Sequence, residues 1–226
     1  MNNLLELERK IGYEFNNKDL ITQAMTHSSF ANTRHMAPHS DNERLEFLGD
    51  AVLEVVSSRF LYDKFPDYDE GSLSRLRASL VCEPTLAYCT EEIDLRKYIL
   101  LSPGEEKTGG RRRKSIISDA MEALIGAIYL DGGIEPARNF IMKYILTDIE
   151  HKRLYHDSKT ALQELIQAHH EKVTYEVIKE EGPDHAKEFE VEAKVGERVI
   201  GKGSGSSKKQ AEQEAAFVAL KKLRNN

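Results

Sequence analysis

The spacing of apolar residues along the chain changes near residue 150. Before that point apolar residues recur three and four positions apart, which is typical of amphipathic helices that pack on one another. After it come a short helical stretch, three runs in which apolar and polar residues alternate as in half-buried strands, and a final helical stretch. The pattern predicts an all-α domain over residues 1–150, a linker over 151–156 and a small α+β domain, in the order α-β-β-β-α, over 157–226.

Prolines and glycines mark where the predicted elements begin and end. In the first domain the expected helices cover residues 4–12, 20–27, 42–64, 72–81, 84–92, 115–131 and 136–150, with loops over 31–41 and 102–114. In the second domain we expect helices over 159–169 and 208–223, strands over 173–179, 189–195 and 199–200, and a Gly/Ser loop over 201–207.

Two of the predicted helices, 42–64 and 115–131, are apolar on nearly every side, which is typical of buried helices. Each is nevertheless interrupted by acids that share one face: Glu43, Glu46 and Asp50 on the first, and Asp119 and Glu122 on the second. Burying a carboxylate without a partner costs several kcal/mol or more, on the order of the desolvation penalty of an ion. The acids therefore require a cation.

That cation is a metal ion or an arginine. If the two helices face each other, Glu46, Asp50, Asp119 and Glu122 surround a common point, and such oxygen ligands suit Mg²⁺ or Mn²⁺ rather than zinc. The alternative is a set of buried ion pairs with neighbouring arginines, for which the candidates are Arg44, Arg75 and Arg77. Two acid pairs on two helices favour the metal, and a metal held by carboxylates with waters left over is the chemistry of many nucleases.

Two further motifs of the first domain each allow two interpretations. The sequence His27-Ser28-Ser29 could form a nucleophilic site, but no acid is positioned beside it, so a hydrogen-bond cluster at a helix end is favoured. The basic run over residues 111–114 is either a solvated face or a phosphate contact, with the solvated face favoured.

The net charge of −6 argues at first against a nucleic-acid partner, because phosphate binding usually leaves a basic surface, so any basic footprint must be local. Lys208 and Lys209 open the last helix, where backbone amides and the helix dipole favour phosphate. Gln163 and Gln167 share a face of the first helix of this domain, and Gly182-Pro183-Asp184-His185 joins its first two strands. Three such regions fit the shape-based recognition of an A-form RNA duplex.

Cysteine content and hydropathy indicate the cellular setting. Cys82 and Cys89 are too few for a disulfide scaffold and lack zinc-ligand spacing, so we expect reduced thiols in a cytoplasmic protein. The longest apolar run, residues 123–130, is shorter than a membrane span, and no export signal is expected.

Two long motifs resemble the signatures of the bacterial ribonuclease III family. They are residues 42–53, NERLEFLGDAVL, and residues 118–127, SDAMEALIGA. The shorter segments 26–30 (THSSF) and 69–71 (DEG) are similar to further blocks of the family, and segments 182–185 (GPDH) and 206–211 (SSKKQA) are similar to its double-stranded RNA-binding domain. The resemblance covers essentially the whole chain, with no departure at an acidic position.

The resemblance implies a Mg²⁺-dependent endonuclease, with Mn²⁺ able to substitute, that cuts both strands of double-stranded RNA and leaves 5′-phosphate and 3′-hydroxyl ends. Glu46, Asp50, Asp119 and Glu122 would bind the metal, with Asp50 and Glu122 catalytic and with Glu43 and Glu70 as supporting acids. RNA would be bound by Gln163, Gln167, His185, Lys208 and Lys209.

The family also dimerises, and Phe47 would insert into the partner subunit, although a core position for Phe47 is an equal alternative. Expected partners are double-stranded RNA and a second copy of the chain, with no membrane and no DNA, and expected substrates are ribosomal and messenger RNA precursors. The other function left open is a dimeric protein that binds double-stranded RNA without cleaving it, its acids forming structural ion pairs.

Overall fold

The computed structural model describes residues 4–149, 158–168, 170–182, 187–205 and 207–224. Contacts divide the chain into two compact units, Met1–Ile149 and Glu150–Asn226, and each unit is described by itself below. The predicted linker, 151–156, lies outside the described residues. In the described segments, no helix is both long enough and apolar enough to cross a membrane.

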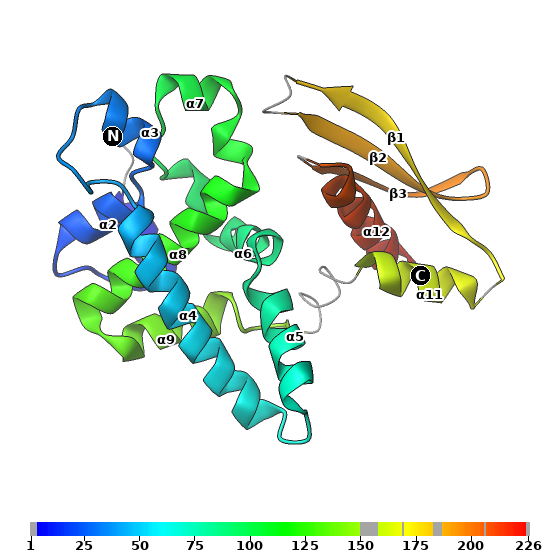
Figure 1. The fold of residues 1–226 in the computed structure, drawn as a ribbon, viewed down its shortest axis with the longest axis horizontal. Coiled ribbons are helices and arrows are strands. Elements are labelled where there is room, and N and C mark those ends of the chain that lie inside the picture. Colours follow the sequence, from blue (N-terminus) through cyan, green and yellow to red (C-terminus); the bar gives the residue numbers. More distant parts are fainter. Residues whose placement is uncertain (1–3, 150–157, 169, 183–186, 206, 225–226) are drawn as a thin grey trace. The chain divides into compact units, whose positions relative to one another are not determined.

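The first unit is mostly helical, as predicted (Figure 1). Its α-helices are α1 (Leu4–Ile11), α2 (Lys18–Ala24), α3 (Ser28–Thr33), α4 (Glu43–Lys64), α5 (Glu70–Val81), α6 (Glu83–Cys89), α7 (Pro103–Lys107), α8 (Lys114–Gly132) and α9 (Ile134–Tyr144). Three short 3₁₀ turns, Thr90–Ile93, Leu95–Lys97 and Gly110–Arg112, connect them, and a single bridge pairs Thr26 with Leu100.

Two short helices, α3 and α7, fall where the sequence analysis expected mainly loop. Each begins at a side-chain cap that satisfies backbone N–H groups of the first turn. The His27 side chain accepts a hydrogen bond from the Ser29 amide, and Ser102 Oγ accepts one from the Glu105 amide. Neither helix is long enough to show apolar periodicity, so neither could be recognised by that criterion.

Helix α8 is the centre of the first unit and packs most extensively on α4, which crosses it (Figure 1). Its apolar side chains from Ile116 to Ile128 are buried, as the sequence predicts. The crossing is close because Gly49 of α4 and Gly126 of α8 lie at the contact, each facing the backbone of the other helix. This close contact brings the acidic faces of the two helices together.

The expectation that α4 is buried on nearly every side is wrong. Phe47 is 80% exposed and Val55 is 65% exposed, and Ala51 between them is exposed as well. These residues are four apart and therefore form one apolar stripe along the helix. Other apolar residues of α4, among them Leu45, Val52 and Leu53, face the core. The helix thus has one apolar face in the core and another at the surface of the single chain.

The second unit has the predicted α-β-β-β-α order. Its elements are α11 (Ser158–Gln167), β1 (Val173–Glu181), β2 (Glu188–Val195), β3 (Arg198–Gly205) and α12 (Lys208–Arg224). The strands form an antiparallel sheet in the order β1-β2-β3, with irregularities in register at Val177/Lys179 and at Ala193/Lys194. Alternate residues of β2 are buried with α11 and α12 in one core: Phe189, Val191, Ala193 and Val195. The alternation predicted for this strand is therefore confirmed.

Strand β3 continues through most of the stretch expected to be a Gly/Ser loop. Gly201 and Gly203 face α12, and a Cβ atom on either residue would collide with the backbone around Ala215. The glycines are required because the helix backbone lies directly against the strand. The Gly/Ser composition of this stretch is typical of a loop, but Gly201 and Gly203 allow the strand and the helix to pack closely.

Candidate metal centre and RNA-binding face

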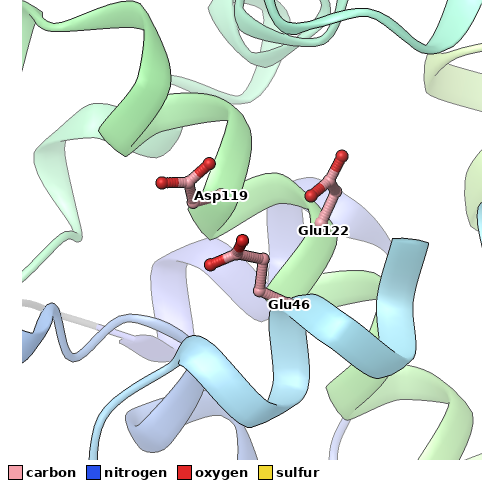
Figure 2. Close-up of side chains that lie close together, drawn as sticks. All are labelled: Glu46, Asp119 and Glu122. Carbon is pink, nitrogen blue, oxygen red and sulfur yellow. The ribbon is translucent and has the colours of Figure 1, made fainter.

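Three carboxylates from two helices converge in the first unit. Glu46 lies on α4, and Asp119 and Glu122 lie on α8, with the three side chains close together (Figure 2). One oxygen of each carboxylate lies within 4.8 Å of the others. Asp119 and Glu122 share a face of α8 because they are three residues apart, and the α4–α8 crossing sets Glu46 opposite them.

The environment of the three acids penalises their negative charge. Burial, followed by the charges of Asp119, Glu43 and Asp50, raises the pKa of Glu46 to about 7. Burial, followed by the charges of Asp50, Glu46 and Asp119, raises the pKa of Glu122 to about 8. The pKa of Asp119 is also raised, mainly by burial. A cation at this point would relieve both the repulsion and the desolvation.

In the described part of the chain, none of the three candidate arginines forms an ion pair with these acids. Arg77 forms an ion pair with Glu54 at 3.3 Å and donates a hydrogen bond to Ser58 Oγ at 2.7 Å. Arg75 donates to Ser72 Oγ at 3.1 Å, and Arg44 is exposed. Across the described ranges, no ion pair includes Glu46, Asp119 or Glu122. The ion-pair alternative therefore has no support for these three acids.

The donor set fits a divalent metal. All three groups offer carboxylate oxygens, which are the ligands that Mg²⁺ and Mn²⁺ prefer, and neither cysteine nor histidine belongs to the cluster. Three side chains leave further coordination positions for water or a substrate oxygen.

The other predicted acids lie outside this group of three. Asp50 is exposed one turn along α4 from Glu46, yet its charge contributes to the raised pKa of both Glu46 and Glu122. Glu43 is exposed at the start of α4 and contributes to the raised pKa of Glu46. Glu70 is exposed in the first turn of α5, where it accepts a hydrogen bond from Ser74 Oγ at 2.8 Å. Within one chain Glu70 is thus not part of the cluster.

One further acid near the cluster was missed from the sequence. Glu83, exposed at the start of α6, contributes to the raised pKa of Asp119. Helix α6 packs on α8, and that tertiary contact brings Glu83 near the site. No spacing in the sequence relates Glu83 to Asp119, so no sequence pattern could have identified it.

The sequence His27-Ser28-Ser29 has the structural role that the sequence analysis favoured. His27 Nδ1 is 2.8 Å from Ser29 Oγ and accepts a hydrogen bond from the Ser29 amide at 3.2 Å. Ser29 Oγ in turn accepts one from the Ser102 amide at 3.2 Å, which connects the start of α3 to the start of α7. The favoured interpretation, a hydrogen-bond cluster at a helix end, is confirmed.

Two arginines of the basic run at 111–114 form ion pairs within the first unit. Arg111 forms an ion pair with Glu106 at 2.7 Å and donates to the carbonyl of Ile99 at 3.0 Å. Arg113 forms an ion pair with Glu105 at 2.7 Å, whereas Arg112 is exposed. The run therefore includes two arginines that hold the segment between α7 and α8 in place.

Four of the five predicted RNA-contact residues lie on the two helices of the second unit. Gln163 and Gln167 are exposed one turn apart on α11, and Lys208 and Lys209 are exposed in the first turn of α12. Ser207 Oγ accepts a hydrogen bond from the Gln210 amide at 3.2 Å and thereby caps α12. His185 lies outside the described residues.

Each of the two units matches a known protein family. Residues 17–149 match the family described as Ribonuclease-III-like, and residues 158–223 match the double-stranded RNA binding motif. The chain is 50% identical over 224 residues to "Ribonuclease 3" of Caldanaerobacter subterraneus subsp. tengcongensis, a match that covers 97% of this chain and 98% of that protein.

Solved structures agree with the family matches. The nuclease domain of ribonuclease III from Campylobacter jejuni, solved at 2.2 Å resolution, is 45% identical, with a TM-score of 0.59, and covers 64% of this chain and 95% of its own. A second structure of that domain, whose title describes flexibility in a region involved in dimer formation, has the same identity and TM-score and covers 63% and 96%.

A helical nuclease unit with a carboxylate cluster, followed by a double-stranded RNA-binding unit, defines an endoribonuclease that acts on duplex RNA. The chain belongs to the ribonuclease III family. Enzymes of this family depend on a divalent metal, and the cluster formed by Glu46, Asp119 and Glu122 is where the described residues fit one.

Proposed function

We propose that this endoribonuclease uses Mg²⁺, held by Glu46, Asp119 and Glu122 with Asp50 beside them, to hydrolyse both strands of double-stranded RNA. The observation that carries the proposal is the convergence of three carboxylates within 4.8 Å, without an arginine or lysine paired to any of them among the described residues. Mn²⁺ is expected to substitute, because it accepts the same oxygen ligands.

The acids of α4 and α8 would bind and orient the metal ion. When bound, the metal would supply charge neutralisation at a phosphoryl oxygen and a water activated for attack. Because the pKa of Glu122 is raised to about 8, its carboxyl group would be largely protonated at neutral pH and would release that proton as the cation binds. Asp50, exposed one turn along α4 from Glu46, would complete the set of metal ligands, and Glu43 and Glu70 would be the supporting acids.

Hydrolysis would join the water oxygen to phosphorus and break the bond to the 3′-oxygen, which leaves with a proton. The products would carry 5′-phosphate and 3′-hydroxyl ends. This polarity follows from the family resemblance, and end-labelling of the fragments tests it directly.

The second unit would supply the preference for duplex RNA. Gln163 and Gln167, exposed on α11, would contact 2′-hydroxyls in a minor groove, and Lys208 and Lys209, exposed at the start of α12, would contact phosphates. His185, between β1 and β2 in sequence, would contact a second minor groove. Recognition of this kind reads the shape of the A-form helix rather than its base sequence.

The active form would be a homodimer. In support, Phe47, Ala51 and Val55 form an exposed apolar stripe on α4, and a groove of about 600 Å³ beside Phe47 is lined by Leu45, Leu48 and Leu130 among others. The Campylobacter jejuni domain, 45% identical, is described as forming a dimer. Insertion of Phe47 into the partner would place two sites on one duplex, one for each strand.

The cytoplasm is the proposed location, and precursors of ribosomal and messenger RNA are the proposed substrates. The experiment that tests the function is incubation of a long RNA duplex with the protein in Mg²⁺ and, separately, in EDTA. Shortening of the duplex only with Mg²⁺, and no cleavage of the corresponding single strands, is the expected result. An intact duplex at saturating Mg²⁺ would refute the proposal.

A further inference from the structure

Glu180 lies near the end of β1, close to where α12 begins. It is the register partner of Phe189 on β2, and Phe189 is buried in the core between the sheet and the helices. Cross-strand partners in an antiparallel sheet point to the same face. The Glu180 side chain is therefore on the face of the sheet that carries the helices.

The carboxylate of Glu180 contacts two lysines at once. Its Oε1 atom lies 2.9 Å from Lys187 Nζ, and its Oε2 atom lies 3.8 Å from Lys208 Nζ. The Lys208 ammonium also lies 5.7 Å from the centre of the Phe189 ring. Lys208, the first residue of α12, is thus held by a carboxylate and an aromatic ring of neighbouring strands.

This arrangement resembles the binding of an anion at the start of a helix. The N-terminal end of a helix carries a partial positive charge that favours anions, and Lys208 adds a full charge there. Glu180 is an anion already in contact with that lysine. An RNA phosphate that approaches Lys208 would meet the negative charge of Glu180 beside the ammonium.

We propose that Glu180 competes with RNA phosphate for Lys208 and so sets the affinity of the protein for duplex RNA below what its lysines alone would give. The inference rests on the proposed phosphate contact of Lys208. It identifies an acidic residue, outside the contact residues themselves, that limits how tightly RNA is bound.

The expected effect of Glu180 on RNA affinity can be estimated from the solvent exposure of the Lys208–Glu180 ion pair. The side chains of Lys208 and Glu180 are 60% and 40% exposed, so their ion pair is well solvated and screened by salt. Removing such a carboxylate is expected to raise affinity by up to about five-fold at low salt, the range of exposed ion pairs. Because Lys208 would then bind phosphate without first losing a partner, the salt dependence of binding should also steepen.

The test measures binding of the full-length protein to an RNA duplex in EDTA, over a series of salt concentrations, for Glu180→Gln. The matched control is Glu181→Gln, which removes the same charge from the next residue of β1, where Glu181 pairs instead with Lys179 at 3.1 Å. We expect tighter binding and a steeper salt slope for Glu180→Gln, and a smaller change for Glu181→Gln. In a Lys208→Ala background the extra effect of Glu180→Gln should disappear.

The outcomes separate this inference from the proposed function. If Lys208→Ala leaves affinity unchanged, Lys208 does not contact RNA, and both the contact and the competition are refuted. If Lys208→Ala weakens binding but Glu180→Gln behaves like Glu181→Gln, only the competition is refuted. Weaker binding by Glu180→Gln would also refute it, since the carboxylate would then be positioning the lysines for RNA.

Discussion

Gly49 of α4 and Gly126 of α8 lie backbone against backbone where the two helices cross. A Cβ atom on Gly49 would lie 3.0 Å from the amide nitrogen of Gly126, and one on Gly126 would lie 3.1 Å from the amide nitrogen of Gly49. The Cβ on Gly49 would also collide with the carbonyl of Glu122, a residue of the carboxylate cluster. The geometry of the cluster therefore depends on two residues that carry no side chain.

Gly49→Ala is expected to separate α4 from α8, lowering both stability and cleavage. Overpacking at a backbone contact costs about 1–3 kcal/mol or more, which exceeds the roughly 0.5–1 kcal/mol that alanine gains over glycine within a helix. Thermal unfolding and duplex cleavage are the measurements. Gly104→Ala in α7 is the control, because its Cβ would have only an ordinary contact, at 3.8 Å from Ser102 Oγ. Equal behaviour of the two variants would contradict the close-packing argument.

Glu122→Gln is expected to retain RNA binding and to lose cleavage by orders of magnitude. The amide keeps the size of the side chain but removes a charged oxygen ligand from the cluster. Binding in EDTA and cleavage at saturating Mg²⁺ are measured side by side. Glu135→Gln on α9, where the acid is exposed, should behave like the unmodified protein. Full cleavage by Glu122→Gln would exclude Glu122 as a metal ligand.

The metal-free protein is expected to lose stability as pH rises from about 4.5 to about 8 through the contribution of Glu46 and Glu122. Their pKa values in the folded state are about 7 and about 8, above the ordinary value of 4.5. Between these values the folded state binds protons that the unfolded state has released, so raising the pH favours unfolding.

Melting temperatures in EDTA at about pH 5.5 and about pH 8 measure this linkage, and Glu122→Gln isolates its contribution because it removes the titrating group. Mg²⁺ should raise the melting temperature more at the higher pH, since it binds the folded, deprotonated cluster. A pH dependence unchanged by Glu122→Gln would show that the cluster does not control it.

The double variant Lys208→Ala/Lys209→Ala should bind duplex RNA more weakly and with a shallower salt dependence. Each lost phosphate contact lowers the slope of log K against log salt by about 0.7–0.9. Lys221→Ala/Lys222→Ala, near the other end of the same helix, removes the same charge and is the control. If both double variants lose affinity equally, the loss reflects the net charge of the protein and not a phosphate contact of Lys208 and Lys209.

Phe47→Ala should weaken self-association. The ring is 80% exposed in the single chain, and burial of an aromatic side chain contributes on the order of 1.5–3 kcal/mol. Sedimentation over a range of protein concentrations measures the dissociation constant. Leu5→Ala, at a residue 57% exposed on α1, controls for loss of a surface apolar side chain. An unaltered dissociation constant would remove Phe47 from the interface.

Much of the fold followed from periodicity alone, because helices α4 and α8 and strand β2 are long enough to show it clearly. The acids were noticed for the same reason, as charges at helical spacing within apolar segments. The short helices α3 and α7 depend on single caps, which periodicity does not detect.

Two features could not be predicted because they depend on contacts between distant segments. The sequence does not distinguish an apolar residue that faces the core, such as Leu53, from one that lies at the surface, such as Val55. Nor does it indicate that α6 brings Glu83 close enough to Asp119 to raise its pKa. Both facts appear only once α4, α6 and α8 are packed together.

The glycines of β3 also determine which residues of that strand face α12. Side chains alternate between the two faces of a strand, so a shift by one residue would turn Lys202 and Ser204 toward the helix in place of Gly201, Gly203 and Gly205. The backbone of α12 leaves no room for those side chains. The glycines thus favour the observed pairing of β3 with β2, and a substitution such as Gly203→Ser would place a side chain against the α12 backbone in that pairing.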